Sequence, residues 1–293
     1  MLTTAATETL SGAVIRHVLL AKQIPASLEP ISLGLPGVDR HVRAGAGSPE
    51  QVRDAAHQHI SSGNLALQLL TLTEPTASTG NATDLQMLDT LRIWVQGDEH
   101  SAAPAPLLIQ LQGVLICVGP QRIALAGTAE RMTAVTGVAI EFFWLNLEVS
   151  RLEQQIDDRW PELDEDAPAA FELSDAMLDR RERLQQRFQQ MIAARALLAR
   201  LTPRIQCPVI YPPTLASQAA ERLREKSRLG ERLEHLSEQL DVFERVYELC
   251  GQRLSDFISS RKSHMLEWII VVLLTFELLL MVIDLLSTLT QTT

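Results

Sequence analysis

A continuous apolar stretch from Met265 to Leu286 limits the folds open to this chain more than any other feature. At about 1.5 Å per residue, a helix over these roughly 22 residues would be about 33 Å long, enough to cross the hydrocarbon layer of a bilayer. Arg261 and Lys262 precede the stretch, and no basic residue follows it up to Thr293. Because basic flanking residues stay on the cytoplasmic side, the sequence predicts a tail-anchored protein with one membrane span and a cytoplasmic N-terminal part.

Three acidic residues, Glu267, Glu277 and Asp284, interrupt the apolar stretch. Glu267 and Asp284 lie near its ends and can reach water, and Trp268 is expected at the level of the lipid headgroups. Glu277 would lie about 17 Å into the span, where an acidic residue costs about 2.5 to 3.5 kcal/mol. Neighbouring helices would lower that cost, so we expect the span to associate with other helices. A fully buried helix in a soluble oligomer is the alternative.

Residues 1–127 are predicted to form an α+β domain with a mostly antiparallel sheet. Ser48, Pro49 and Gln51 have the pattern of a helix start, for a helix that runs to about Ile60. Residues 25–48, rich in Pro, Gly and Ser, are expected to form a loop. Short apolar runs predict strands, of which the last two form a hairpin, over residues 13–20, 65–72, 91–95, 107–118 and 121–126.

Residues 128–173 are predicted to contain one helix and an acidic linker. Met132, Val135 and Ala139 are spaced for one apolar face of a helix that ends near Trp160. Residues 141–172 include ten acidic and two basic residues. Such a charge density predicts a solvated linker.

Residues 174–262 are predicted to form a helical hairpin whose second arm is a coiled-coil stalk, before the span over 263–286 and a short tail over 287–293. The first arm is expected to begin at Ser174 and to stop before Pro203, and the second to begin near Thr214. In the second arm, apolar residues recur at alternating steps of four and three, which is the a/d repeat of a coiled coil. This seam can pair with other copies or with the first arm of the same chain. It comprises Leu229, Leu233, Leu236, Leu240, Phe243, Tyr247, Cys250, Leu254 and Phe257.

Basic residues are concentrated in the same hairpin. Residues 174–232 contain twelve Arg and Lys against six Asp and Glu, in a chain with a net charge of -10. If the hairpin closes, these residues could meet RNA phosphates, anionic lipid headgroups or the chain's own acidic linker. The candidates are Arg180, Arg181, Arg183, Arg187, Arg222, Arg224, Lys226, Arg228 and Arg232.

The sequence favours a protein that is not an enzyme. Cys117, Cys207 and Cys250 are far apart and form no C-x-x-C pair, which favours a reducing compartment over a disulfide framework or a zinc site. No Ser/His/Asp, Cys/His or paired-carboxylate arrangement is recognisable in the soluble part. We therefore expect no catalytic, cofactor-binding or metal-binding residues, no cofactor and no small-molecule substrate.

The carboxy-terminal part resembles the required-for-meiotic-nuclear-division family. The similarity covers the hairpin segment from Leu223 to Val246, the entry Ser263 to Ile270 with its Leu-Glu-Trp-Ile-Ile motif, and the acidic Glu277 within Phe276-Glu-Leu. The resemblance implies a non-enzymatic, membrane-anchored assembly. Members of that family include a mitochondrial protein that supports translation at the inner membrane, fungal proteins linked to septation, and bacterial relatives.

The leading hypothesis is a tail-anchored, homo-oligomeric scaffold or tether in a lipid bilayer. The Arg- and Ala-rich composition is typical of GC-rich bacteria and favours a bacterial inner membrane, or the mitochondrial inner membrane in a eukaryote. An alternative is an ion-conducting bundle in which Glu277 and Asp284 form stacked carboxylate rings. A third hypothesis is a ribosome or RNA tether that binds through the basic hairpin.

Overall fold

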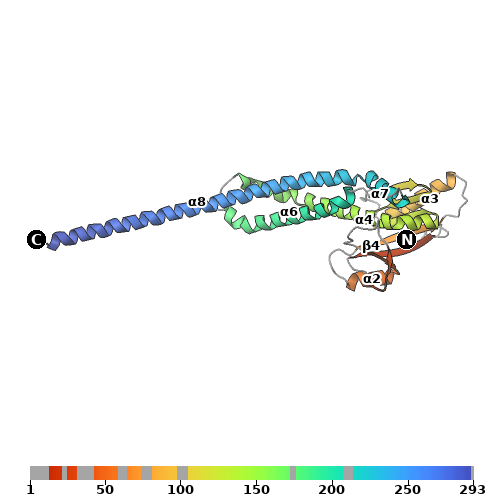
Figure 1. Ribbon diagram of the computed structural model, residues 1–293, viewed down its shortest axis with the longest axis horizontal. Coiled ribbons are helices and arrows are strands. Elements are labelled where there is room, and N and C mark those ends of the chain that lie inside the picture. Colours follow the sequence, from red (N-terminus) through yellow and green to blue (C-terminus); the bar gives the residue numbers. More distant parts are fainter. Residues whose placement is uncertain are drawn as a thin grey trace. The chain divides into compact units, whose positions relative to one another are not determined.

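The computed structural model describes residues 13–21, 25–31, 43–58, 65–73, 81–97, 105–171, 176–206 and 214–291. Within these ranges, only the backbone is described for residues 56–58, 65, 81–86, 176–179 and 282–291. A mixed sheet in the N-terminal part is followed mostly by long helices (Figure 1).

The described strands form one seven-stranded sheet in the order β2-β3-β1-β4-β7-β6-β5. Of its neighbouring pairs, β4 and β7 are parallel and the others are antiparallel, so the expected mostly antiparallel sheet is confirmed. The parallel pair requires a crossover, which the chain makes through α3, β5 and β6. The elements of this part are β1 (Ala13–Ala21), β2 (Glu29–Ile31), β3 (Arg43–Gly47), α2 (Pro49–Gln58), β4 (Leu65–Thr73), α3 (Asn81–Gln96), β5 (Leu107–Leu111), β6 (Val114–Val118) and β7 (Arg122–Gly127).

Helices α2 and α3 cover the same face of the sheet. Leu19 of β1 packs with Val52 of α2, and Leu70 of β4 packs with Leu91 and Trp94 of α3. The register places Ile15 opposite Leu70, so Leu19, four residues further along β1, points to the same side as Leu70. Side chains of the other face, such as those of Leu69, Ile123 and Leu125, are buried as well. Buried side chains therefore lie on both faces of the central part of the sheet, whereas the start of β1, with Val14 and Ile15, is exposed.

Several predicted elements in this part are confirmed. The strands over 13–20 and 65–72 are β1 and β4, and the hairpin across Gly119 and Pro120 joins β6 to β7. The helix start at Ser48 is also correct: the Gln51 backbone N–H donates to the Ser48 hydroxyl, and the Ser48 backbone N–H donates to the Gln51 side chain. This reciprocal pair is the capping box that the sequence pattern predicts.

Three predictions for the sheet region are wrong. Residues 91–95 belong to α3, because the apolar residues Met87, Leu88, Leu91, Trp94 and Val95 follow helical spacing. The predicted strand over 107–118 is two strands, since Gln112 and Gly113 have positive φ angles of 47° and 75° and form a tight turn. The expected loop over residues 25–48 contains the short strands β2 and β3.

The helical part of the chain follows β7. Its elements are α4 (Ala129–Asp157), α5 (Trp160–Asp166), the 3-10 helix η1 (Ala167–Ala170), α6 (Ala176–Gln206), α7 (Leu215–Lys226) and α8 (Leu229–Gln291).

The helical part corrects three further expectations. The acidic segment is not a solvated linker: it forms the end of α4, α5 and η1, and Asp166 is 1% exposed. Helix α6 continues through Pro203 to Gln206, beyond the expected stop. The second arm begins at the Thr214 N-cap as predicted, but it breaks at Ser227 and Arg228, where Arg228 has a φ of 52°. The expected N-cap Ser174 and the prolines at 208, 212 and 213 lie outside the described residues.

The chain divides into two compact units. The sheet unit comprises residues 1–153 and 199–235, and the helical unit comprises residues 154–198 and 236–293. Both units are therefore built from segments that are distant in the sequence. Within the sheet unit, the Lys226 ammonium of α7 donates to the Leu108 carbonyl of β5, and Gln112 donates to Gln218.

Candidate functional site

The C-terminal part of α8 exposes a long and mostly apolar surface. Every side chain from Met265 to Met281 is exposed, and Trp268 is 70% exposed. Two described helical runs are long and apolar enough to be membrane spans, one over residues 129–170 and one within α8. The apolar part of the first is mostly buried, as in the core of a soluble protein, whereas that of α8 is not buried at all. The α8 segment is therefore the candidate anchor.

The acidic residues of this segment have different surroundings. Oε2 of Glu267 lies 3.2 Å from Nδ1 of His264, one helical turn earlier. The Glu277 side chain is exposed between apolar neighbours. Asp284 lies in α8, but only its backbone is described. Glu277 is thus a polar group in the middle of an exposed apolar surface.

The predicted seam is buried within the single chain. Each of its residues from Leu229 to Leu254 is at most 7% exposed, and Phe257 is half-buried. In the helical unit, the ring of Phe243 meets the ring of Trp160 edge to face at 4.8 Å. Arg195 of α6 lies 2.6 Å from Asp241 of α8 and also donates to the Ser237 carbonyl. The seam could pack against other copies or within the same chain, and in this structure it packs within the same chain.

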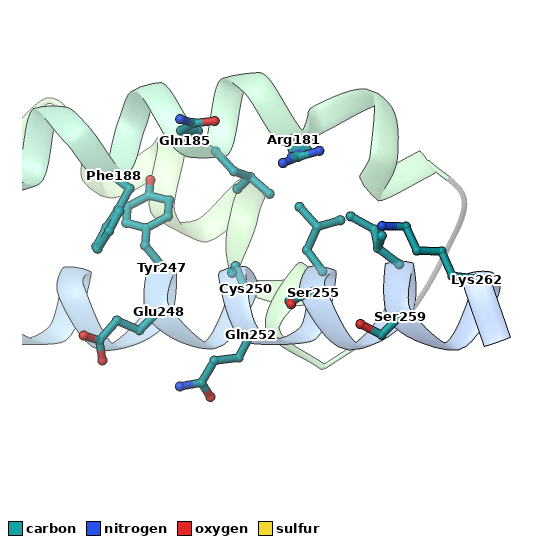
Figure 2. Close-up of a pocket in the computed structure, with 14 residues that line it drawn as sticks. Arg181, Gln185, Phe188, Tyr247, Glu248, Cys250, Gln252, Ser255, Ser259 and Lys262 are labelled. Carbon is teal, nitrogen blue, oxygen red and sulfur yellow. The ribbon is translucent and has the colours of Figure 1, made fainter.

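A groove of about 700 Å³ lies between α6 and α8, beside the last buried seam residues (Figure 2). Leu184 and Phe188 of α6 and Leu254 and Ile258 of α8 give it apolar walls. We call it the α6/α8 groove. All of its lining residues belong to the helical unit.

Two cationic side chains line the groove. Arg181 belongs to α6 and Lys262 to α8, and Lys262 reaches into the space between the two helices (Figure 2). Within the part of the chain that the structure describes, neither cation makes an ion pair or a hydrogen bond. Glu248 also borders the groove, but its side chain projects away from α6. The groove therefore combines apolar walls with two cations that have no acidic partner among the residues that the structure describes.

A buried polar cluster lies next to the groove and joins α5, α6 and α8. Nη1 of Arg187 is 2.5 Å from Oδ2 of Asp166, and the Tyr247 hydroxyl donates to the same oxygen at 3.4 Å. Glu162 and Glu165 are also within 3.5 Å of the Arg187 guanidinium. The Cys250 thiol contacts the Asp166 carbonyl at 3.7 Å. This cluster pairs an arginine of the basic hairpin with the acidic segment.

Burial and charge shift the pKa values in this cluster. Burial raises the pKa of Cys250 to about 11, and the Asp166 charge acts in the same direction. Burial, followed by the Asp166 charge, raises the pKa of Tyr247 well above its usual range. For Arg187, burial alone would lower the pKa, but the hydrogen bond with Asp166 and the Asp166 and Glu162 charges outweigh burial and raise it. At neutral pH the thiol and the phenol are therefore protonated.

The other candidates for polyanion binding are also engaged to different extents. In the helical unit, Arg180 and Arg183 lie 4.0 and 3.4 Å from Glu165. In the sheet unit, Arg224 donates to the Arg204 and Ile205 carbonyls. Exposed pairs within one turn are Arg222 with Glu225 and Arg228 with Glu231. Much of the hairpin's positive charge is thus paired inside the chain.

Arg232, like Arg187, contacts three other residues through its guanidinium. Its Nε lies 2.7 Å from Glu153, its Nη1 donates to Asn146 at 2.7 Å, and its Nη2 donates to the Ser150 hydroxyl at 2.8 Å. All four residues belong to the sheet unit. The planar guanidinium of Arg232 thus links α8 by hydrogen bonds to three successive turns of α4.

The comparisons with known proteins do not assign the chain to a family. No family model and no curated protein matches it. A solved structure of the full-length CmaX protein aligns with a TM-score of 0.37 and 11% sequence identity, over 87% of this chain and 80% of that chain. A similarity this weak carries no argument about function. The resemblance to the required-for-meiotic-nuclear-division family stays a prediction from the quoted residues.

Sequence reasoning missed both the α6/α8 groove and the buried Asp166 cluster. The groove has a faint signal, because Gly251, Ser255 and Ser259 are small residues at helical spacing beside the seam. A Cβ atom added at Gly251 would meet no other heavy atom within 4 Å. Asp166 gave no such signal, since it stands in a run of acidic residues of which its neighbours Asp164 and Glu165 are exposed. Among the described residues, no group of three or more His, Cys, Asp and Glu is placed to hold a metal ion.

Proposed function

We propose that this chain is a tail-anchored membrane scaffold or tether without enzymatic activity, with both units on the cytoplasmic side. The observation that carries the proposal is the fully exposed apolar segment of α8, from Met265 to Met281. A soluble protein seldom leaves so large an apolar surface in water, because its exposure is unfavourable. A bilayer accommodates such a helix with all of its backbone groups paired.

The energetics support insertion despite the acidic residues. Between Met265 and Leu286 the sequence has fifteen Leu, Ile, Val and Phe residues. At about 0.3 to 0.6 kcal/mol each on the insertion scale, these favour the membrane by roughly 5 to 9 kcal/mol. A central acidic residue such as Glu277 opposes this by about 2.5 to 3.5 kcal/mol. The balance favours insertion, and the basic Arg261 and Lys262 before the span support a cytoplasmic location for the preceding units.

The proposal includes self-association, through the membrane span and not through the heptad seam that the sequence suggested. The seam is already buried by the chain's own helices, so it offers little surface to a second copy. The exposed span remains, with Glu277 near its middle. A polar residue inside a membrane is less costly when it faces another helix, so we place the self-contact on the Glu277 face of the span.

A role in translation at the membrane rests on the family resemblance alone. A ribosome contact through the hairpin would have to use basic residues without an acidic partner in the described part of the chain, such as Arg181, or break exposed pairs such as Arg222 with Glu225. The ion-conducting alternative also uses Glu277, as a carboxylate ring in an oligomeric span. Cation flux into liposomes that disappears in Glu277→Gln would favour the alternative.

Membrane fractionation tests the anchor. The full-length chain, expressed in a bacterium, should stay in the membrane pellet after alkaline carbonate extraction. The variant Leu273→Arg with Leu274→Arg should lose this retention, whereas Ile93→Arg with Ile192→Arg, two exposed apolar residues outside the anchor, should keep it. Added protease should digest both units in inside-out vesicles and not in intact spheroplasts. Carbonate release of the unaltered chain would overturn the proposal.

A further inference from the structure

We propose that the α6/α8 groove binds an anionic phospholipid, with the headgroup phosphate between Arg181 and Lys262 and an acyl chain against the apolar walls. The inference rests on the proposed membrane anchor and names a partner for the surface next to it. The groove is within the 300 to 1,000 Å³ range of small-molecule sites, at about 700 Å³.

The charge of the groove points to an anion. The neighbouring arginines Arg180, Arg183 and Arg187 all pair with acidic residues of α5. Arg181 has no such partner within the described residues and lines the groove instead, opposite Lys262. In a chain with a net charge of -10, these two cations at one opening have no acidic partner among the described residues. Phosphate oxygens can accept hydrogen bonds from both cations and from the hydroxyl groups of Ser255 and Ser259.

The walls point to an amphiphile instead of a free anion. Leu184, Phe188, Leu254 and Ile258 line the groove beyond the cations. A phosphate group alone would leave these side chains uncovered, whereas an acyl chain covers them and removes apolar area from water. Gly251 also lines the groove, and a Cβ added there would have no other heavy atom within 4 Å, so a larger side chain has room to occupy this part of the groove.

The position along α8 selects a membrane lipid. Lys262 stands three residues before Met265, where the exposed apolar segment begins, so its backbone lies only about 4.5 Å before that boundary along the helix. This is the depth at which lipid phosphates meet a membrane helix, and basic residues at that depth attract anionic lipid headgroups. The positive charge of the groove and its position next to the span therefore favour an anionic lipid of the cytoplasmic leaflet as its ligand.

Lipid binding by the purified full-length chain in detergent tests the inference. Phosphatidylglycerol should raise the midpoint of thermal unfolding of the helical signal, and phosphatidylcholine should not. The variant Arg181→Gln with Lys262→Gln should weaken phosphatidylglycerol binding about tenfold or more. The variant Arg180→Gln with Arg183→Gln removes the same charge beside the groove and should weaken it no more than about threefold. The uncharged change Gly251→Phe should block binding by filling the groove.

The outcomes separate the groove from general charge attraction and from other occupants. Equal losses in the two double variants would reduce the effect to surface charge and overturn the inference. Unchanged binding by Gly251→Phe would do the same. A dimer in lipid-free detergent that Gly251→Phe dissociates would assign the groove to a second copy instead. Release of the chain by carbonate would refute the anchor, but it would not decide the lipid site, because lipid binding is measured in detergent. Absence of lipid binding in detergent would refute the lipid site, but it would not refute the anchor.

Discussion

The guanidinium of Arg187 on α6 and the carboxylate of Asp166 at the end of α5 form an ion pair that is almost closed off from solvent. The Arg187 side chain is 13% exposed and that of Asp166 is 1% exposed. Arg187 also has Glu162 and Glu165 within reach, whereas the Asp166 carboxylate contacts only the side chains of Arg187 and Tyr247 among the described residues. The two partners therefore depend on each other unequally.

This asymmetry predicts unequal costs of substitution. Arg187→Met leaves the Asp166 carboxylate buried without its cation and should destabilise the helical unit by about 3 to 5 kcal/mol. Asp166→Asn should cost less, about 1 to 3 kcal/mol, because Arg187 keeps two carboxylates. The double variant Asp166→Leu with Arg187→Met should recover much of the loss. Thermal unfolding in detergent, followed by circular dichroism, measures all three.

Arg183→Met is the matched control for the Arg187 prediction. Arg183 is half-exposed and faces Glu165, so its loss should change stability by no more than about 0.5 kcal/mol. If Arg183→Met proved as harmful as Arg187→Met, the buried pair would not be the source of the effect.

The Arg232 cluster predicts that a lysine cannot replace this arginine. An ammonium group cannot reach Glu153, Asn146 and Ser150 in the fixed fork that the guanidinium provides. Arg232→Lys should therefore destabilise the sheet unit by about 1.5 to 3 kcal/mol. Arg228→Lys, at an exposed pair with Glu231, should be neutral. Urea unfolding of the two variants decides the point, and equal midpoints would refute it.

The buried seam changes the expected result of a double substitution. The sequence-based hypothesis of a stalk predicts that Leu236→Asp with Leu240→Asp dissociates an oligomer. The structure predicts that this variant unfolds the helical unit even as a monomer, because both side chains are 1% exposed and each would bury a carboxylate. Val242→Asp, on the exposed side of the same helix, should be tolerated. Circular dichroism together with light scattering distinguishes unfolding from simple dissociation.

Stability should fall as the pH rises above about 9. Burial raises the pKa of Cys117 and that of Cys250 to about 11, above the ordinary thiol value of 9.0. The unfolded chain then releases these protons first, so the stabilisation is fully present below pH 9 and is lost between pH 9 and 11. Each thiol should contribute on the order of 1 kcal/mol of loss by pH 10.

A chain with Cys207→Ser isolates these two thiols for measurement. Both should resist a thiol reagent at pH 8 until the chain unfolds, since the thiolate is the reactive form. Adding Cys250→Ala should make the decline of stability with pH shallower. Rapid labelling of the folded protein would contradict the prediction.

Local patterns in the sequence predicted local structure well, and they failed where the partner is distant. The Ser48 and Gln51 capping box and the strands β1 and β4 depend on neighbouring residues, and they are confirmed. The run Leu91 to Val95 is too short to separate a strand from a helix, and the helical spacing appears only when Met87 is included.

The candidate site was less accessible to sequence reasoning for the same reason. A heptad repeat shows that a helix buries one stripe, but it does not show which surface covers that stripe. Asp166 looked like one more solvated carboxylate, because its partner Arg187 is 21 residues away on another helix. The exposed apolar segment of α8 was predictable because its signal is the composition of a single stretch.

The division of the sheet unit into residues 1–153 and 199–235 has a consequence for the order of events during synthesis. The sheet strands are synthesised first, whereas α7 and Arg232, which contacts α4, are complete only when residue 235 has been added. At about 5 to 20 residues per second, that takes roughly 10 to 50 s. Until then the partners of β5 and α4 are missing, and their apolar surfaces stay open to misassembly. The nascent chain must therefore be shielded until just before its hydrophobic anchor leaves the ribosome.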